Sequence, residues 1–161
     1  HQRETRNAMR RRALWFLSHV IKINFLDHGP LWITYLISVT KTNDIAAYFI
    51  GSKWGKKSLL PSVSPKKSVE GTVAGIVAGG LVSLFFGIWL PVDFGWLHLV
   101  ALGMVIAVVG QCGDLSESII KRYCSKKDSG ETIPGFGGIL DVVDSVLFTV
   151  PLFYFYLKAV L

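Results

Sequence analysis

Two long windows without any charged residue constrain the fold of this chain more than any other feature. Gly71 to Val92 contains 22 residues and Phe94 to Gly113 contains 20, none of them Asp, Glu, Lys or Arg. A hydrocarbon core about 30 Å thick needs roughly 20 apolar helical residues to cross it. Only 17% of the residues are charged, whereas a soluble domain carries about 25%. The windows predict an integral membrane protein and argue against a disordered chain or a disulfide scaffold.

The apolar segments predict an all-α fold, a polytopic membrane bundle with about four to five transmembrane helices. The first segment, Ala13–Leu26, is short and carries Lys22 and Asn24. An alternative for this segment is therefore a helix that lies in the membrane interface. The polar loop from 114 to 136 should continue the preceding helix in its first part. The expected spans are Ala13–Leu26, Leu31–Ile50, Gly71–Leu90, Trp96–Cys112 and Gly138–Leu161.

The basic residues are clustered between the expected spans. The net charge of +6 would suggest nucleic acid in a soluble protein, but 14 of the 17 Lys and Arg residues fall in three groups. This clustering is typical of cytoplasmic loops, so we expect no nucleic-acid partner. Loops on the opposite side carry Asp27 and Asp93 and no basic residue. The groups are Arg3, Arg6, Arg10, Arg11 and Arg12; Lys53, Lys56, Lys57, Lys66 and Lys67; and Lys121, Arg122, Lys126 and Lys127.

Four carboxylates lie at the cytoplasmic ends of the expected spans: Asp44, Asp114, Asp141 and Asp144. A charge within a span is costly and therefore points to function. Asp141 and Asp144 are three residues apart, so they share one helix face. Carboxylates that face one another repel unless a cation lies between them, and oxygen ligands suit Mg²⁺. The alternative is that these acids pair with nearby Lys and Arg side chains.

The loop from Gly51 to Gly71 combines five lysines with three glycines and five serines. Glycine lets backbone N–H groups approach a phosphate, and lysine supplies the charge. The loop lacks the Walker A spacing. Its alternative role is to contact acidic lipid headgroups. The segment 64–68 directly precedes a helix start, which favours phosphate because a helix N-terminus attracts anions.

A third polar element precedes the last span. It runs from Lys127 through Gly138, and Gly137 and Gly138 give a flexible approach to the helix that carries Asp141. Carboxylates for a divalent metal, with lysines and glycines for polyphosphate, suit phosphoryl or nucleotidyl transfer to a lipid at the cytoplasmic membrane surface.

These motifs resemble those of the phosphatidate cytidylyltransferases, also called CDP-diacylglycerol synthases. The upstream element of that family is matched by Asp44, Ala47, Tyr48, Phe49, Gly51, Gly55, Lys56 and residues 64–71. A central Gly-Asp-Leu-x-Glu-Ser element is matched by residues 113–118. The signature near the C-terminus is matched, with every spacing kept, by Ser118, Lys121, Arg122, Lys127, Asp128, Gly130, Ile133, Pro134, Gly137, Gly138, Asp141 and Asp144.

The resemblance implies transfer of CMP from CTP to phosphatidate, which gives CDP-diacylglycerol and pyrophosphate. It implies that Asp114, Asp141 and Asp144 hold Mg²⁺, with a monovalent cation such as K⁺ beside it. Further catalytic residues would be Lys121, Arg122 and Lys127, which hold phosphate charge. The implied substrate-binding residues are Asp44, Ser64, Lys66, Lys67, Ser68, Glu70, Asp128, Gly137 and Gly138.

The chain departs from the family pattern at two positions, Phe136 in place of His and Val142 in place of Arg. Phe cannot hydrogen-bond phosphate and Val carries no charge, so a catalytically silent relative with a structural or regulatory role is an alternative. A cytidylyltransferase acting on an ether-lipid phosphate is another. A CDP-alcohol phosphatidyltransferase is disfavoured, because the D-G-x2-A-R run of that class is absent.

The organisation of the chain follows from these assignments. Residues 1–30 are expected to form a basic cytoplasmic segment with the weak span, and residues 31–161 the cytidylyltransferase-like membrane domain. The loop-like start at His1 leads us to expect the C-terminal part of a larger protein. We expect a multi-pass protein of the cell (inner) membrane with its active site towards the cytoplasm. The Gly-rich segment 71–80 suggests close helix packing, including a homodimer contact.

Overall fold

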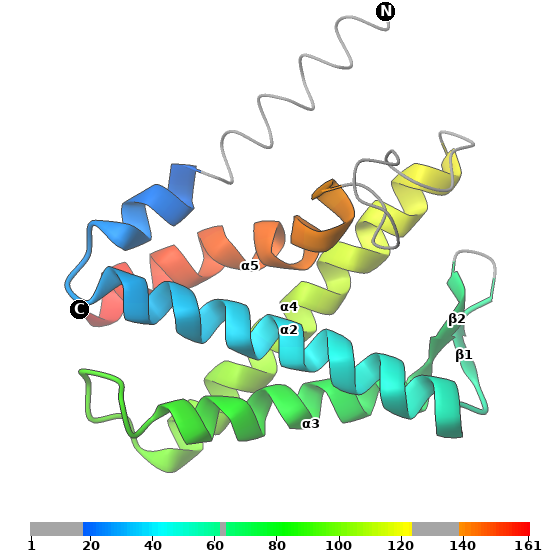
Figure 1. Ribbon diagram of the computed structural model, residues 1–161, viewed down its shortest axis with the longest axis horizontal. Helices are drawn as coiled ribbons and strands as arrows, with labels where there is room; N and C mark the ends of the chain where they lie inside the picture. Colours follow the sequence, from blue (N-terminus) through cyan, green and yellow to red (C-terminus); the bar gives the residue numbers. More distant parts are fainter. Residues whose placement is uncertain (1–17, 62–63, 124–138) are drawn as a thin grey trace, which may run out of the picture.

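The chain forms a helical bundle with one short β-hairpin, as the computed structural model shows (Figure 1). The structure describes residues 18–61, 64–123 and 139–161. Residues 18–24 are helical. The labelled elements are α2 (Gly29–Trp54), β1 (Ser58–Leu60), β2 (Ser64–Ser68), α3 (Val69–Phe86), α4 (Trp96–Tyr123) and α5 (Ile139–Val160).

Helix α3 lies between α2 and α4 and packs along both of them. Helix α5 packs against α4 and also contacts α2. The hairpin pairs β1 with β2 in antiparallel fashion and joins the end of α2 to the start of α3 (Figure 1). The loop expected from Gly51 to Gly71 therefore contains a two-stranded ribbon, which the sequence did not suggest.

The helix boundaries follow local stop and start signals more than hydropathy. Helix α2 begins at Gly29, with Pro30 in its first turn, and runs four residues past the expected end at Ile50. His28 precedes it in the left-handed region, with φ of 58°. Helix α4 continues through Asp114 to Tyr123, which confirms that the first part of the expected polar loop is helical.

The side chains of α3 have the opposite arrangement to those of a helix in a water-soluble protein. Its buried residues are small, namely Gly71, Gly75, Gly79, Gly80 and Ser83. Its exposed residues are large and apolar, including Val73, Val77, Leu81, Leu84 and Phe85. Small residues inside let helix backbones approach closely in lipid, and large apolar residues outside face the lipid chains. This distribution indicates a membrane protein.

Two helical segments of the described chain are long and apolar enough to cross a membrane, Val69–Phe86 and Trp96–Ser116. The apolar part of α5, Phe148–Val160, is shorter. The predicted all-α membrane bundle is thus confirmed as a mostly helical fold with two membrane-capable helices. The count of four to five spans stays a prediction.

The glycines of α3 are used for contacts within the chain. A Cβ atom on Gly79 would lie 2.9 Å from the Cβ of Ala107, and one on Gly103 of α4 would lie 2.5 Å from the carbonyl oxygen of Gly79. Gly71 and Gly75 approach α2 in the same way. The segment expected to offer a homodimer surface therefore places these glycines against α2 and α4 of its own chain.

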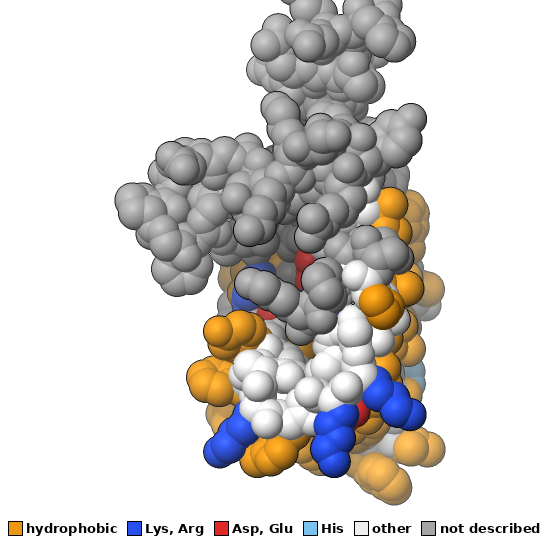
Figure 2. Space-filling view, turned by 90° about the vertical axis from the view of Figure 1, so that its right-hand side faces the viewer, with side chains coloured by type: hydrophobic (Ala, Val, Ile, Leu, Met, Phe, Trp, Pro, Cys, Tyr) orange, Lys and Arg blue, Asp and Glu red, His pale blue; other side chains and the backbone are white. Residues whose placement is uncertain are grey.

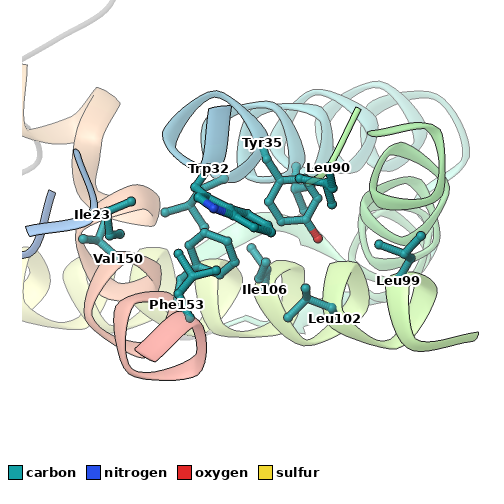
Figure 3. Packing of buried hydrophobic residues seen from close by; sticks show 12 residues of the cluster. Ile23, Trp32, Tyr35, Leu90, Leu99, Leu102, Ile106, Val150 and Phe153 are labelled. Atoms are coloured by element: carbon teal, nitrogen blue, oxygen red, sulfur yellow. The ribbon is translucent and has the colours of Figure 1, made fainter. Parts of the chain in front are cut away.

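A cluster of aromatic side chains fills the centre of the bundle (Figure 3). Trp32 and Tyr35 of α2 meet Phe153 of α5, with ring centroids 6.1 Å and 5.6 Å from the Phe153 ring. Beside them, Ser83 Oγ donates a hydrogen bond to the carbonyl oxygen of Leu99 at 2.5 Å. The Ser83 hydroxyl has one proton, so Tyr35 donates the bond that links these two side chains at 2.7 Å. Ser83 thereby ties α2, α3 and α4 together.

We expect Ser83→Ala to lower the free energy of unfolding by about 1–2 kcal/mol, because the buried Tyr35 hydroxyl loses its partner. Thr34→Ala is the matched control, since the exposed Thr34 hydroxyl bonds only to the carbonyl oxygen of Pro30 in its own helix. The melting temperature in detergent measures both variants. An equal change in the two would contradict a bridging role for Ser83.

Candidate functional site

A cavity of about 620 Å³ opens where α2, the hairpin, α3 and α4 meet. This volume is typical of small-molecule sites. Seen from the hairpin end, basic side chains lie along the lower edge of a surface of backbone and uncharged polar groups, and acidic side chains are visible beside them (Figure 2). The cavity is lined by Asn43, Asp44, Ala47, Tyr48, Gly51, Ser52, Leu59, Ser64, Lys67, Ser68, Thr72, Gln111, Asp114 and Leu115.

The cavity brings together five residues that the sequence predicted for the site from three separate segments. They are Asp44 on α2; Ser64, Lys67 and Ser68 on β2; and Asp114 on α4. Helix α2 contributes residues 43, 44, 47, 48, 51 and 52, which form two adjacent rows on one helix face. The hairpin closes over these rows because β2 leads directly into α3.

Lys67 and Asp114 form an ion pair across the cavity. They are separated by 47 positions in the sequence, and their side chains are 29% and 38% exposed. The family resemblance implies that Lys67 binds nucleotide phosphate and that Asp114 binds a metal ion. The ammonium group therefore balances the carboxylate that we expect to bind a cation, and either group can exchange this partner for a ligand of the same charge.

Ser68 and Glu70 have local structural partners that were not foreseen. Ser68 caps α3, because its Oγ accepts a hydrogen bond from the backbone N–H of Gly71 at 3.1 Å. Its hydroxyl proton stays available as a donor. Glu70 accepts from the backbone N–H groups of Lys56 and Lys57 at 3.1 Å and 3.4 Å. Glu70 thus orients the turn between α2 and β1, and it does not line the cavity.

A directed chain of hydrogen bonds forms the inner end of the cavity. Gln111 Nε2 donates to Asn43 Oδ1 at 2.7 Å and to the carbonyl oxygen of Thr72 at 3.1 Å. Asn43 Nδ2 donates to Asp44 Oδ1 at 3.2 Å. Asp44 Oδ2 in turn pairs with Lys41 Nζ at 3.2 Å. Sequence reasoning missed Asn43 and Gln111, although polar residues within apolar helices are a recognised signal for function.

Gly75 makes this series of hydrogen bonds possible. A Cβ atom at position 75 would lie 2.5 Å from Asn43 Oδ1 and 2.9 Å from both Asn43 O and Gln111 Nε2. The absence of a side chain lets the amides of α2 and α4 meet over the surface of α3. The close approach that the glycine-rich span predicted therefore builds part of the site.

Helix α5 approaches the cavity beside Asp114. A Cβ on Gly113 would lie 2.9 Å from three side-chain atoms of Phe148. Position 144 precedes Phe148 by one helical turn, about 6 Å along the axis, and position 141 by about 10 Å. The backbone positions of Asp141 and Asp144 thus lie at the start of α5, within two turns of the contact next to Asp114.

Several predicted site residues lie outside the residues that the structure describes. Lys127, Asp128, Gly137 and Gly138 fall in residues 124–138, as does Phe136. A second group is placed only by its helix or strand, namely Lys66 in β2, Lys121 and Arg122 in α4, and Asp141, Val142 and Asp144 in α5.

The donor chemistry of the cavity fits a divalent cation in part. Asp44 and Asp114 both line it, and each carboxylate already bonds to an ammonium group. Carboxylate oxygens are the ligands that Mg²⁺ prefers. Among the described side chains, no three His, Cys, Asp or Glu residues gather into one cluster. A complete magnesium site would need ligands from positions such as 141 and 144.

Comparison with known proteins gives a consistent result. The model of the cytidylyltransferase family matches residues 11–160. The phosphatidate cytidylyltransferase of Bacillus subtilis is 41% identical over 140 residues, which cover 86% of this chain and 52% of the relative. The phosphatidate cytidylyltransferase of Chlamydia muridarum is 43% identical over 132 residues, covering 78% and 43%. An uncharacterized Escherichia coli protein, YnbB, is 36% identical over 146 residues, covering 91% and 48%.

The chain spans about half the length of these curated relatives. The residues that the family model matches, 11–160, include the cavity and all the predicted site residues.

Proposed function

Because the chain belongs to the cytidylyltransferase family, we propose that it acts in a phosphatidate cytidylyltransferase. This enzyme transfers CMP from CTP to phosphatidate and releases pyrophosphate. The observation that carries the proposal is the cavity in which Lys67 and Asp114 meet at the hairpin end of the bundle. A charged cavity at one end of apolar helices suits a reaction between a water-soluble nucleotide and a lipid phosphate.

The reaction is a displacement at phosphorus. An oxygen of the phosphatidate phosphate bonds to the α-phosphorus of CTP, and the bond from that phosphorus to the oxygen bridging to the β-phosphate breaks. Pyrophosphate leaves with the electron pair of that bond. A phosphate monoester is largely dianionic near pH 7, so the attacking oxygen needs no side chain to remove a proton. Positioning and charge balance are then the main tasks of the protein.

We assign these tasks to the residues that line the cavity. Lys67 exchanges Asp114 for a phosphate group of CTP, and Ser64 and Ser68 offer hydroxyl donors beside it. Asp114 is then free to bind a cation together with Asp141 and Asp144. Lys121, Arg122 and Lys127 hold the phosphatidate or pyrophosphate charge. Bound Mg²⁺ would neutralise the phosphates and stabilise the charge that develops during displacement.

The membrane placement follows the charge distribution. Lys53, Lys56, Lys57 and Lys67 lie at the hairpin end, whereas Asp93 lies in the turn between α3 and α4 at the other end of these helices. By the positive-inside rule, the cavity faces the cytoplasm. We propose a multi-pass protein of the cell inner membrane, with CTP entering from the cytoplasm and phosphatidate from the bilayer.

The proposal is tested by CDP-lipid formation from labelled CTP and phosphatidate, with the full-length protein in detergent. We expect product that requires Mg²⁺ and disappears with a chelator. An ether-lipid phosphate, supplied in parallel, tests the choice of acceptor. Exclusive use of the ether lipid would replace phosphatidate in the proposal. CTP binding without product from either lipid would contradict the enzyme assignment and indicate a silent relative.

A further inference from the structure

The inner end of the cavity differs in chemistry from its mouth. The neutral amides of Asn43 and Gln111 line the inner end beside the Asp44 carboxylate, whose charge Lys41 balances, whereas Lys67 and Asp114 lie nearer the hairpin. Asp114 follows Gln111 by three residues on α4, about 4.5 Å along the axis. Ala47, Tyr48 and Leu115 supply apolar and aromatic lining in the same cavity. A nucleotide has the same order of parts, from neutral base to charged phosphates.

The orientation of the Gln111 amide is fixed by its partners. The Thr72 carbonyl oxygen can only accept a hydrogen bond, so the Gln111 atom that faces it is the NH₂ group. The Asp44 carboxylate, paired with Lys41, likewise accepts only, so it takes the NH₂ group of Asn43 and leaves Asn43 Oδ1 for Gln111. A flip of either amide would place two acceptors together. The acceptor-only partners therefore determine which atom of each amide is the nitrogen and which is the oxygen.

This arrangement leaves one polar atom of Gln111 without a partner. Both protons of Nε2 are engaged, and within the described part of the chain Gln111 Oε1 accepts no hydrogen bond. Gln111 lines the cavity and is half-buried. The side chain thus offers the cavity a fixed acceptor and no donor.

We infer that Gln111 Oε1 reads the base of the nucleotide by accepting a hydrogen bond from the exocyclic amino group of cytosine. Uracil has a carbonyl oxygen at the same place, so UTP would set two acceptors against each other. Asn43 acts as a positioning residue, since it holds the Gln111 amide and is itself completely buried. The Tyr48 ring, also in the cavity wall, provides a surface on which a base can stack.

The inference rests on the proposed function and is tested by nucleotide selectivity. The full-length protein in detergent is supplied with CTP or UTP and phosphatidate, and kcat/KM is measured for each. We expect Gln111→Leu to lower the CTP-to-UTP ratio about tenfold or more, mainly by raising KM for CTP. Ser116→Ala is the control on the same helix, because its hydroxyl bonds only to the carbonyl oxygen of Cys112 and lies outside the cavity.

A second readout and a second variant keep the test decisive. The rise in melting temperature with CTP or UTP reports binding without turnover, and wild type should respond to CTP far more than to UTP. If Gln111→Leu does not fold, Gln111→Asn, which shortens the side chain by one methylene, should lower the ratio instead. An unchanged ratio in a folded variant would overturn the inference and leave the cytidylyltransferase proposal intact. Wild type that neither binds nor uses CTP would overturn both.

Discussion

Asp114→Asn is expected to reduce CDP-lipid formation by about 10²- to 10³-fold, the usual effect of removing one fixed charge-stabilising group from an active site. Asn keeps the size of the side chain and one acceptor oxygen but loses the negative charge. That charge pairs with Lys67 in the cavity and, in the proposed reaction, binds the cation that neutralises the phosphates. Initial rates at saturating CTP and Mg²⁺ measure the effect.

The same substitution should have little effect on stability. Both side chains of the Lys67–Asp114 pair are partly exposed, and exposed ion pairs contribute about 0–1 kcal/mol. The melting temperature should therefore stay near that of wild type. Asp93→Asn makes the same chemical change at an exposed position in the turn before α4 and should leave the rate unaltered. An Asp114→Asn rate within threefold of wild type would remove Asp114 from the catalytic machinery.

The sequence predicted those parts of the fold that depend on hydropathy and local spacing. The charge-free windows gave the positions of α3 and of the first part of α4, because length and apolarity alone decide whether a helix can cross a membrane. The polar residues after Gly113 keep helical spacing, so the extension of α4 was also predictable. The hairpin was not predictable, because β2 contains Pro65 and two lysines, and a two-stranded ribbon tolerates proline on its edges.

The sequence predicted the charged residues of the site but not its neutral amides. Asp114 and Lys67 stand out in the sequence because a charge beside an apolar span needs a reason. The ion pair between Asp114 and Lys67 could not be predicted from the sequence, because it depends on how the hairpin folds against α4. Gln111 looks like a single polar interruption of an apolar helix, and Asn43 like one more residue of the polar run 40–44. Their meeting requires α2, α3 and α4 to converge at Gly75, and no local spacing encodes that contact.

Gly75→Ala is expected to disrupt the packing of the bundle and the inner end of the cavity together. The added methyl would lie 2.5 Å from Asn43 Oδ1 and 2.9 Å from the Asn43 backbone oxygen. The backbone oxygen of Asn43 cannot rotate away, so α2 and α3 must separate. Overpacking of this kind lowers the free energy of unfolding by about 1–3 kcal/mol. The Gln111–Asn43 hydrogen bond would break as well, which should weaken CTP binding. Thermal unfolding in detergent and the CTP-induced shift of the melting temperature measure the two effects.

Gly80→Ala is the matched control on the same helix. Its new methyl would lie 3.2 Å from Met104 Cγ and 3.4 Å from Val100 Cγ1, and the flexible Met104 side chain can move. Both substitutions gain helix propensity, by about 1 kcal/mol, so their difference isolates the contact at position 75. We expect Gly80→Ala to be neutral or slightly stabilising while Gly75→Ala melts earlier and binds CTP more weakly. Equal melting temperatures would mean that α2 and α3 do not approach as closely at Gly75 as the structure has them.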